Sequence, residues 1–290
     1  MRLGYACINE SLKPKKFRSI RLKTIQTKGI DYLKYIVLEN LEFLLEVLEW
    51  NSAHDIYFYR ISSDIMPLIT HPEVTALGWQ WQKDKEVIDA LDKIRVFKLK
   101  ENMRLSMHPD QFTVLNSLRP DVVKSSMEYL VYHADFLEAV SGDDMILHVG
   151  GVYGDKPAAM MRFIHVANSL PDKVKTYLRI ENDDKSYNIY ELLSISEQTG
   201  LPVVFDFHHH RCLVDDHVTK DLLDKIFSTW TGIPKVHISS GKRHPKDRSH
   251  SHYIDDDDKS WVYMLEQYDV DIMIEAKGKE KTLLKLREDL

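Results

Sequence analysis

The chain has 290 residues, of which 43% are hydrophobic and 29% charged, and these ordinary globular values exclude a disordered or fibrous protein. Its apolar runs are too short to span a membrane, its start has no signal-peptide core, and its two cysteines make no disulfide framework, so we expect a cytoplasmic protein without a membrane partner. The net charge of −6 argues mildly against binding nucleic acid by charge alone, although bound divalent metals would change the local field.

Short β-rich runs alternate with helical stretches along the chain. The eight predicted strands are Leu3–Cys7, Ile56–Ile61, Arg104–His108, Met145–Val149, Thr176–Glu181, Pro202–Asp206, Lys235–Ile238 and Asp271–Glu275. The eight predicted helices are Asp31–Trp50, Lys83–Lys100, Pro120–Val140, Pro157–Leu170, Tyr187–Thr199, Thr219–Thr229, Lys259–Tyr268 and Lys279–Leu290.

This alternation predicts a parallel sheet, because a helix must carry the chain back between parallel strands. Eight units in this length predict a (β/α)₈ TIM barrel formed by residues 1–290 as a single domain. A doubly wound open sheet is the competing interpretation. It is disfavoured because no glycine-rich phosphate loop follows the first strand.

Side chains able to bind metals stand at or near the ends of six successive predicted strands and in the loops that follow. These candidates are His108, His148, Glu181, Asp206, one of His208, His209 and His210, His237, His250 and Glu275, and His71 lies in the loop after the second strand. The active site of a TIM barrel lies at the C-terminal strand ends, so we expect them to meet. Imidazole and carboxylate together suit Zn, Mn, Fe or Co rather than Ca. One metal takes about four protein ligands, so this set predicts two or three divalent ions, and a carboxylate such as Glu181 can bridge two of them.

Three basic clusters lie in loops that follow strands. They are Lys13, Lys15, Lys16 and Arg18 after the first strand, Lys242, Arg243, Lys246 and Arg248 after the seventh, and Lys277, Lys279 and Lys281 after the eighth. Each alone is typical of a solvated loop, but their shared face favours binding of a phosphate polymer. Clustered metals hydrolyse phosphate esters by activating water and by neutralising charge on the phosphate. Together these features predict a metal-dependent enzyme that cuts such a polymer.

The motifs of the chain, taken in order, carry a family resemblance over nearly its whole length. They are Leu3–Asn9, Arg60–Ser63, Met107–Pro109 with Gln111, His148–Gly151, Glu181–Asp183, Asp206 with His209, Lys235–Ser240, His250 with Tyr253 and Ile254, and Glu275–Glu280. With these motifs the sequence resembles the UV damage endonucleases, which are related in fold to endonuclease IV and to the xylose isomerase-like barrels.

The resemblance implies an enzyme that nicks damaged double-stranded DNA immediately 5′ of UV photoproducts (cyclobutane dimers and 6-4 photoproducts), leaving a 3′-hydroxyl and a 5′-phosphate. It implies two or three divalent ions, with Mn²⁺ expected and Zn²⁺, Co²⁺ or Mg²⁺ as alternatives. The matching ligands are His71, His108, His148, Glu181, Asp206, His209, His237, His250 and Glu275. Strict strand alternation would instead place Asp206, His208 and His210 on one face. The family pattern selects His209, which fits a chain that leaves the strand at Asp206.

The resemblance also assigns other roles. Glu181, Lys235, His237 and Glu275 are the expected catalytic residues, and Gln111, Phe112, Tyr5, Asn9 and Lys277 are the expected DNA and lesion contacts. Lys235 matches a lysine that can be carboxylated, and its alternative is a strand lysine paired with an acid. Gln111 and Phe112 match residues inserted into the duplex, although the family usually has Tyr in place of Phe112 and Gly in place of Asp110. Tyr5 and Asn9 fit packing at the barrel mouth equally well.

Two other functions are compatible with parts of this pattern. A metal-dependent sugar isomerase on a similar barrel would need a small closed pocket and no basic loops. A lesion-binding protein that does not cut would lack ligand positions, and here the set is complete. We expect a monomer, because the enzyme must engage bent DNA, and a site of action at the nucleoid.

Overall fold

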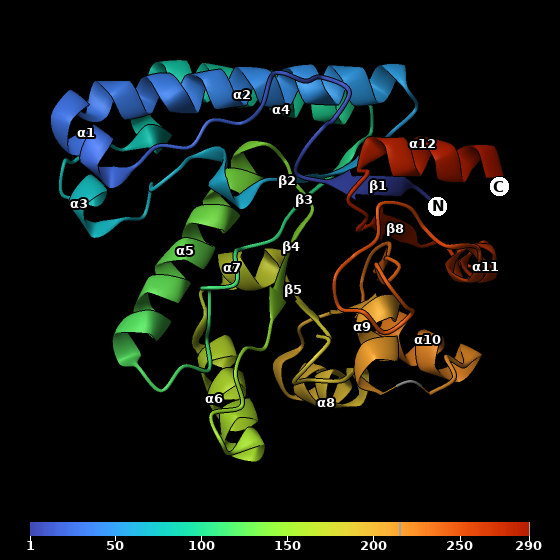
Figure 1. Ribbon diagram of the computed structural model, residues 1–290. Coiled ribbons are helices and arrows are strands. Elements are labelled where there is room, and N and C mark those ends of the chain that lie inside the picture. The colour runs from blue at the N-terminus through green and yellow to red at the C-terminus, as the bar shows by residue number, and fades with distance from the viewer. Residues whose placement is uncertain (215, 290) are drawn as a thin grey trace.

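The computed structural model describes residues 1–214 and 216–289, so Leu290 of the last predicted helix lies outside the described residues. Eight parallel strands close into a barrel in chain order, and β1 pairs with β8 to complete it (Figure 1). The strands are β1 (Leu3–Ala6), β2 (Phe58–Ile61), β3 (Arg104–Met107), β4 (Asp144–His148), β5 (Leu178–Glu181), β6 (Val203–Asp206), β7 (Lys235–Ile238) and β8 (Asp271–Ile274). The predicted (β/α)₈ barrel is confirmed.

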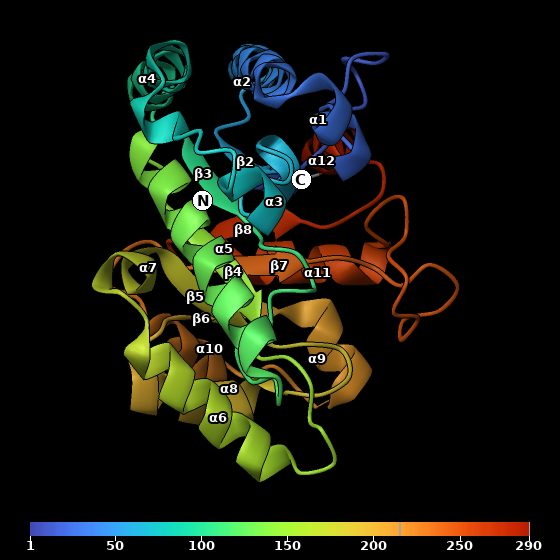
Figure 2. The same ribbon diagram turned by 90° about the vertical axis from the view of Figure 1, so that its left-hand side faces the viewer.

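Helices surround the barrel (Figure 2), and more of them are present than the sequence pattern predicts. They are α1 (Leu22–Lys28), α2 (Ile30–Ala53), α3 (Pro72–Thr75), α4 (Lys85–Lys100), α5 (Pro120–Ala139), α6 (Lys156–Ser169), α7 (Asp172–Tyr177), α8 (Ile189–Thr199), α9 (Phe207–Leu213), α10 (Lys220–Phe227), α11 (Asp256–Leu265) and α12 (Glu280–Asp289), with 3₁₀ turns η1 (Ser63–Ile65) and η2 (Trp81–Lys83). The unpredicted α1, α3, α7 and α9 are short, so their apolar periodicity is too brief to detect.

Local hydrogen bonds explain two shifted boundaries. Thr176 belongs to α7 and not to the predicted strand, because its hydroxyl bonds back to the carbonyl of Asp172 at 3.0 Å within the helix. The helix predicted from Tyr187 begins at Ile189, because Asn188 caps it and forms a reciprocal capping box with Glu191. Tyr187 is therefore left in the loop before α8, where its side chain is buried.

The interior of the barrel has a charged layer at the N-terminal end of the strands. Arg104, Asp144, Lys235 and Asp271 are the first residues of β3, β4, β7 and β8, and all four are buried. Arg104 donates to Asp144 at 2.8 Å and to Asp271 at 3.0 Å. A small apolar cluster of Ala6, Phe58 and Met273 is also buried in the barrel. These layers fill the interior of the barrel, so the C-terminal mouth is the place expected for an active site.

No helix in the described part of the chain is both long and apolar enough to cross a membrane.

Candidate metal centre

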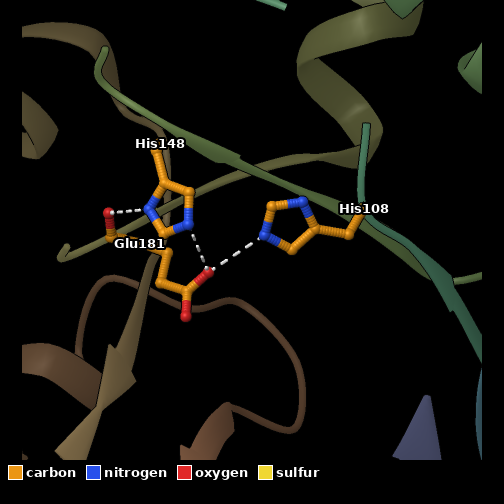
Figure 3. A group of neighbouring side chains, drawn as sticks. All are labelled: His108, His148 and Glu181. Atoms are coloured by element: carbon orange, nitrogen blue, oxygen red, sulfur yellow. Dashed lines mark hydrogen bonds and ion pairs between the residues drawn. The ribbon is translucent and has the colours of Figure 1, made fainter. Parts of the chain in front are cut away.

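Glu181, the last residue of β5, is the centre of the site. Its buried carboxylate belongs to three groups of closely spaced ligand atoms. The groups are His108, His148 and Glu181; Glu181, Asp206 and His209; and Glu181, His237 and Glu275. Figure 3 shows the first group, in which the Nε2 atoms of His108 and His148 converge on one Glu181 oxygen at 3.3 and 3.6 Å. Residues at or next to the C-terminal ends of β3 to β8 thus lie close together.

Backbone carbonyls orient four histidines of the mouth. The Nδ1 atoms of His108, His148, His209 and His250 lie 2.9, 3.3, 2.9 and 2.6 Å from the carbonyls of Pro109, Glu181, Asn182 and Glu275. A carbonyl only accepts, so each Nδ1 carries a proton, and Nε2 is the ring nitrogen left to bind a metal. This is the arrangement that prepares a histidine to bind a metal through Nε2.

Two buried atoms of the candidate ligands lack hydrogen-bond partners among the described residues. They are Nε2 of His237 and Oδ2 of Asp206. A buried polar atom without a partner is costly, and a cation at these positions would satisfy both. The donor set of imidazole and carboxylate fits a divalent transition metal, so the residues present match the predicted metal site.

The charges of the site also favour cations. Burial alone would raise the pKa of Glu181, but nearby His237 and His148 outweigh it and hold the pKa well below its usual value. Burial would lower the pKa of His237, yet Glu181 and Glu275 raise it to about 9. Likewise, Asp206 and Glu181 overcome burial and raise the pKa of His209 to about 9. The three carboxylates therefore attract positive charge, which protons supply when metals do not.

The chain leaves β6 at Asp206, as the family pattern indicates. Asp206 caps α9 by accepting from the backbone N–H of His209 at 2.7 Å, so a helical turn brings His209 next to Asp206 and Glu181. His208 instead contacts the carbonyl of Asp247 at 3.0 Å, and His210 pairs with Asp216 at 2.5 Å. Strict strand alternation fails here because the segment is a helix.

Two expected ligands lie outside the three groups. His250 is beside them, with its ring centroid 6.2 Å from that of His209. His71 caps α3, and its Nδ1 accepts from the N–H of Glu73 at 3.2 Å. Its ring is therefore not oriented in the way the other histidines are. The ligand role of His71 stays a prediction from the resemblance.

Lys235 belongs to the charged layer and forms a buried ion pair with Asp144. It lies two residues before His237 on β7, so it occupies the same side of the strand one layer below the metal candidates. Burial lowers the pKa of Lys235 to about 8. The structure thus contains the alternative pairing with an acid, and a catalytic or carboxylated Lys235 stays a prediction.

Arg60 also belongs to the site, and the sequence analysis gave it no role there. It lies on β2, is nearly buried, and pairs with the carboxylate of Glu275. Glu275 is also 3.1 Å from Nδ1 of His237, so Arg60 helps to fix the third ligand group. Two signals were available: its place in the motif Arg60–Ser63, and its place in β2, two residues after the inward-facing Phe58.

The expected lesion contacts differ in how exposed their side chains are to solvent. Gln111 and Phe112 project from the loop after β3, and Phe112 is 77% exposed. Tyr5 and Asn9 are buried; Asn9 donates to the Tyr5 hydroxyl at 2.9 Å, and that hydroxyl donates to Asn51 at 2.6 Å. This placement favours the packing alternative for Tyr5 and Asn9.

The basic clusters differ in how far carboxylates neutralise them. In the first cluster, Lys13, Lys15 and Arg18 pair with Glu10, Glu46 and Glu39. Within residues 1–214 and 216–289, no carboxylate pairs with Lys242 or with any lysine of the third cluster, Lys277 included. In the second cluster Arg243 and Arg248 pair with Asp247 and Asp184. Positive charge available to phosphates is therefore concentrated after β8, and the loop after β7 projects from the barrel in Figure 2.

Comparisons with known proteins agree with this geometry. A family model described as UV-endonuclease UvdE matches residues 1–290. A curated UV DNA damage endonuclease of Bacillus cereus (strain G9842) is 37% identical, with 100% of this chain and 94% of that protein aligned. Another, from Bacillus pumilus (strain SAFR-032), is 39% identical, with 92% and 85% aligned.

Solved structures give the same result at the level of the fold. The crystal structure of SacUVDE superposes with a TM-score of 0.91 and 35% identity, covering 100% of this chain and 98% of that one. Endonuclease IV from Thermus thermophilus has a TM-score of 0.62 and 15% identity, with 99% and 98% covered. D-psicose 3-epimerase from Clostridium cellulolyticum H10 has a TM-score of 0.58 and 10% identity, with 95% and 85% covered. At such low identities the last two show a shared fold alone.

Proposed function

The chain belongs to the UvdE family of UV endonucleases, enzymes that act on DNA phosphodiester bonds, and from this premise we propose that it nicks duplex DNA immediately 5′ of UV photoproducts. The substrates would be cyclobutane dimers and 6-4 photoproducts, and the products a 3′-hydroxyl and a 5′-phosphate. The observation that carries the proposal is the position of Glu181, which joins three ligand groups at the barrel mouth.

The three groups would hold two or three divalent ions, with Mn²⁺ as the proposed metal and Zn²⁺, Co²⁺ or Mg²⁺ as alternatives. When bound, these ions supply Lewis-acid stabilisation of the phosphodiester and lower the pKa of water. Glu181 would bridge, His108 and His148 would ligate on one side, and Asp206 with His209 on another. His237 and Glu275 would complete the third group, with His250 and His71 as outer members of the set.

The protein's own contribution is orientation. Backbone carbonyls set the histidine tautomers, and Arg60 holds one Glu275 oxygen, so the ligands are arranged before any cation arrives. Burial of Glu181 and Asp206 excludes water from the carboxylates and strengthens their attraction for cations. Such an arrangement suits a phosphodiester, which must be held while its bond to the upstream 3′-oxygen breaks.

Lesion recognition would use the exposed tip of the loop after β3. Phe112 and Gln111 would enter the duplex at the damaged step, where stacking is already weakened and displacement costs less. Lys277 and Lys242, which lack carboxylate partners among the described residues, would contact the phosphate backbone. We propose that the enzyme works as a monomer on chromosomal DNA in the cytoplasm.

The test is a nicking assay on an end-labelled duplex with one cyclobutane dimer, with undamaged duplex alongside. Wild-type protein with Mn²⁺ should cut directly 5′ of the dimer, and EDTA should abolish this cutting. Glu181→Gln should abolish cutting and weaken Mn²⁺ binding measured by calorimetry. Glu197→Gln removes the same charge from the exposed surface of α8 and should leave both unchanged.

Other outcomes would point to the two alternative functions. Tight binding to the dimer duplex without a cut in any divalent metal would indicate a lesion-binding protein. No binding and no cutting would leave the sugar isomerase, which at present has support from the shared fold alone.

A further inference from the structure

The loop between β3 and α5 combines an exposed tip with a buried anchor. Phe112 at the tip is 77% exposed, whereas Leu115 and Asn116, a few residues later, are completely buried. The amide Nδ2 of Asn116 donates to the carbonyl of Gly151 at 2.8 Å and lies 3.3 Å from the hydroxyl of Tyr187. Because Asn116 is close in sequence to Phe112, it limits where the tip can move.

Tyr187 completes the junction from the other side. Its side chain is buried, and its hydroxyl donates to the same carbonyl of Gly151 at 3.1 Å. Its own backbone carbonyl accepts from the N–H of Asp183 at 3.0 Å, two residues after Glu181. Three loops therefore meet at the carbonyl of Gly151: those that follow β3, β4 and β5.

The packing at this junction leaves no room for adjustment. Gly150 has φ +108°, and a Cβ at that position would lie 2.5 Å from Oδ1 of Asn116. Arg162 on α6 donates to the backbone carbonyl of Asn116 at 3.1 Å and fixes the loop from outside. Gly150 is thus required both by its backbone conformation and by the close approach of Asn116.

The junction lies between the proposed lesion contacts and the metal ligands. On one side, Asn116 follows Phe112 closely in the same loop. On the other, Gly151 comes shortly after His148, and Tyr187 is bonded to the segment that follows Glu181. The tip that would enter the duplex is therefore joined through hydrogen bonds to the centre that would cut it.

We propose that Asn116 and Tyr187 are positioning residues that set which phosphodiester is cut, by fixing the distance from the lesion contact to the metal ligands. This inference rests on the proposed function. Neighbouring phosphates of one DNA strand follow each other every ~3.4 Å along the helix axis. A shift of the tip by a few ångströms would therefore present a different bond to the metal centre, and reaction rates are sensitive to misplacement of about 1 Å. Loosening the junction should therefore change the position of the cut as well as its rate.

The test compares two tyrosines that lie close together in the chain. Tyr187→Phe deletes the hydroxyl at the junction, and Tyr190→Phe deletes a hydroxyl on the 47% exposed Tyr190, which bonds to Asp216 at 2.6 Å. The cut positions are mapped on an end-labelled duplex with a single dimer. Tyr187→Phe should raise the share of product cut at a neighbouring phosphate by about two- to tenfold, the effect of losing one hydrogen bond. Tyr190→Phe should cut like the wild type.

A second variant and a second measurement complete the experiment. Asn116→Ala should spread the cuts further, and Ser117→Ala, next to it in the loop, should not. Binding to the dimer duplex in EDTA, followed by the fluorescence of a 2-aminopurine beside the lesion, should change less than twofold for Tyr187→Phe, because the tip itself is intact. Thermal unfolding identifies any variant that fails to fold, and Tyr187→Phe, which loses one atom, then decides the question.

The outcomes distinguish failure of the positioning role from failure of the proposed function. If Tyr187→Phe is folded and cuts only at the wild-type position, whether at full or reduced rate, the positioning role is wrong. If the cuts spread while binding is retained, it is supported. If the wild type does not cut the dimer duplex at all, the proposed function fails and this inference fails with it.

Discussion

Glu280, the first residue of α12, accepts hydrogen bonds from the backbone N–H of Ser11 at 2.8 Å and from its hydroxyl at 3.0 Å, although 269 residues separate the two. The same carboxylate accepts from the N–H of Glu10 at 2.9 Å. Glu280 is completely buried and follows Glu275 closely in the chain. The loop after β1 is therefore tied to the segment that carries a proposed metal ligand and Lys277.

This contact predicts that Glu280→Gln releases the loop after β1. In the glutamine an NH₂ donor replaces one of the two accepting oxygens and would face a backbone N–H donor. We therefore expect hydrogen exchange at the amides of Glu10 and Ser11 to rise by about tenfold. Glu288→Gln, on the exposed side of the same helix, removes the same charge and should leave this exchange unchanged. Equal exchange in both variants would show that the carboxylate does not hold the loop.

Phe112 should matter for lesion binding and not for folding. Its side chain is exposed, so Phe112→Ala should change the free energy of unfolding by no more than about 0.5 kcal/mol. Loss of ring stacking should weaken binding to a dimer duplex by about 1–3 kcal/mol, with little effect on undamaged duplex. Leu118→Ala, which truncates another exposed side chain of the same loop, is the control. An equal loss in both variants, measured by fluorescence anisotropy, would contradict a specific role for the ring.

The buried pair of Lys235 and Asp144 can be tested by a double-mutant cycle. Burial alone would raise the pKa of Asp144, but Lys235 and Arg104 hold it below its usual value, which indicates strong pairing. Lys235→Met should cost about 3–5 kcal/mol in the free energy of unfolding, because it removes one partner of a buried pair. With Asp144→Asn, the cycle should show a favourable coupling of about 0.5–3 kcal/mol. An absent coupling, with a mass increase of one carbon dioxide, would instead indicate a carboxylated Lys235.

His133 should make the protein less stable in acid. Its ring is completely buried on α5, and burial lowers its pKa to about 4. In the unfolded chain this histidine has a higher pKa, about 6.5, and therefore binds a proton first as the pH falls. The stability that comes from keeping the ring neutral is complete above about pH 6.5 and is lost as the pH falls from about 6.5 to about 4. In this range the free energy of unfolding should fall by up to about 1.4 kcal/mol for each pH unit. His133→Gln should lose this slope in urea unfolding, whereas His165→Gln, on the exposed face of α6, should keep it.

The sequence predicted the parts of the structure that depend on local pattern. Eight apolar β-rich runs are sufficient to define the barrel, because a closed parallel sheet buries both faces of every strand. The polar residues Glu181, Asp206 and Glu275 could be placed together without coordinates, because parallel strands end on one face. Short helices such as α7 and α9 were missed, because one or two turns carry too little periodicity.

Sequence by itself therefore determined the barrel, the side of it that carries the chemistry, and most of the candidate ligands. Strand alternation alone favoured His208 and His210, and the family resemblance favoured His209. The tertiary structure places His209 next to Glu181, because Asp206 caps a helical turn at this point. It also decided the contacts of Glu280 with Ser11 and of Asn116 with Gly151. Such hydrogen bonds join loops that are far apart in the chain, and their partners follow from how the closed barrel brings those loops together.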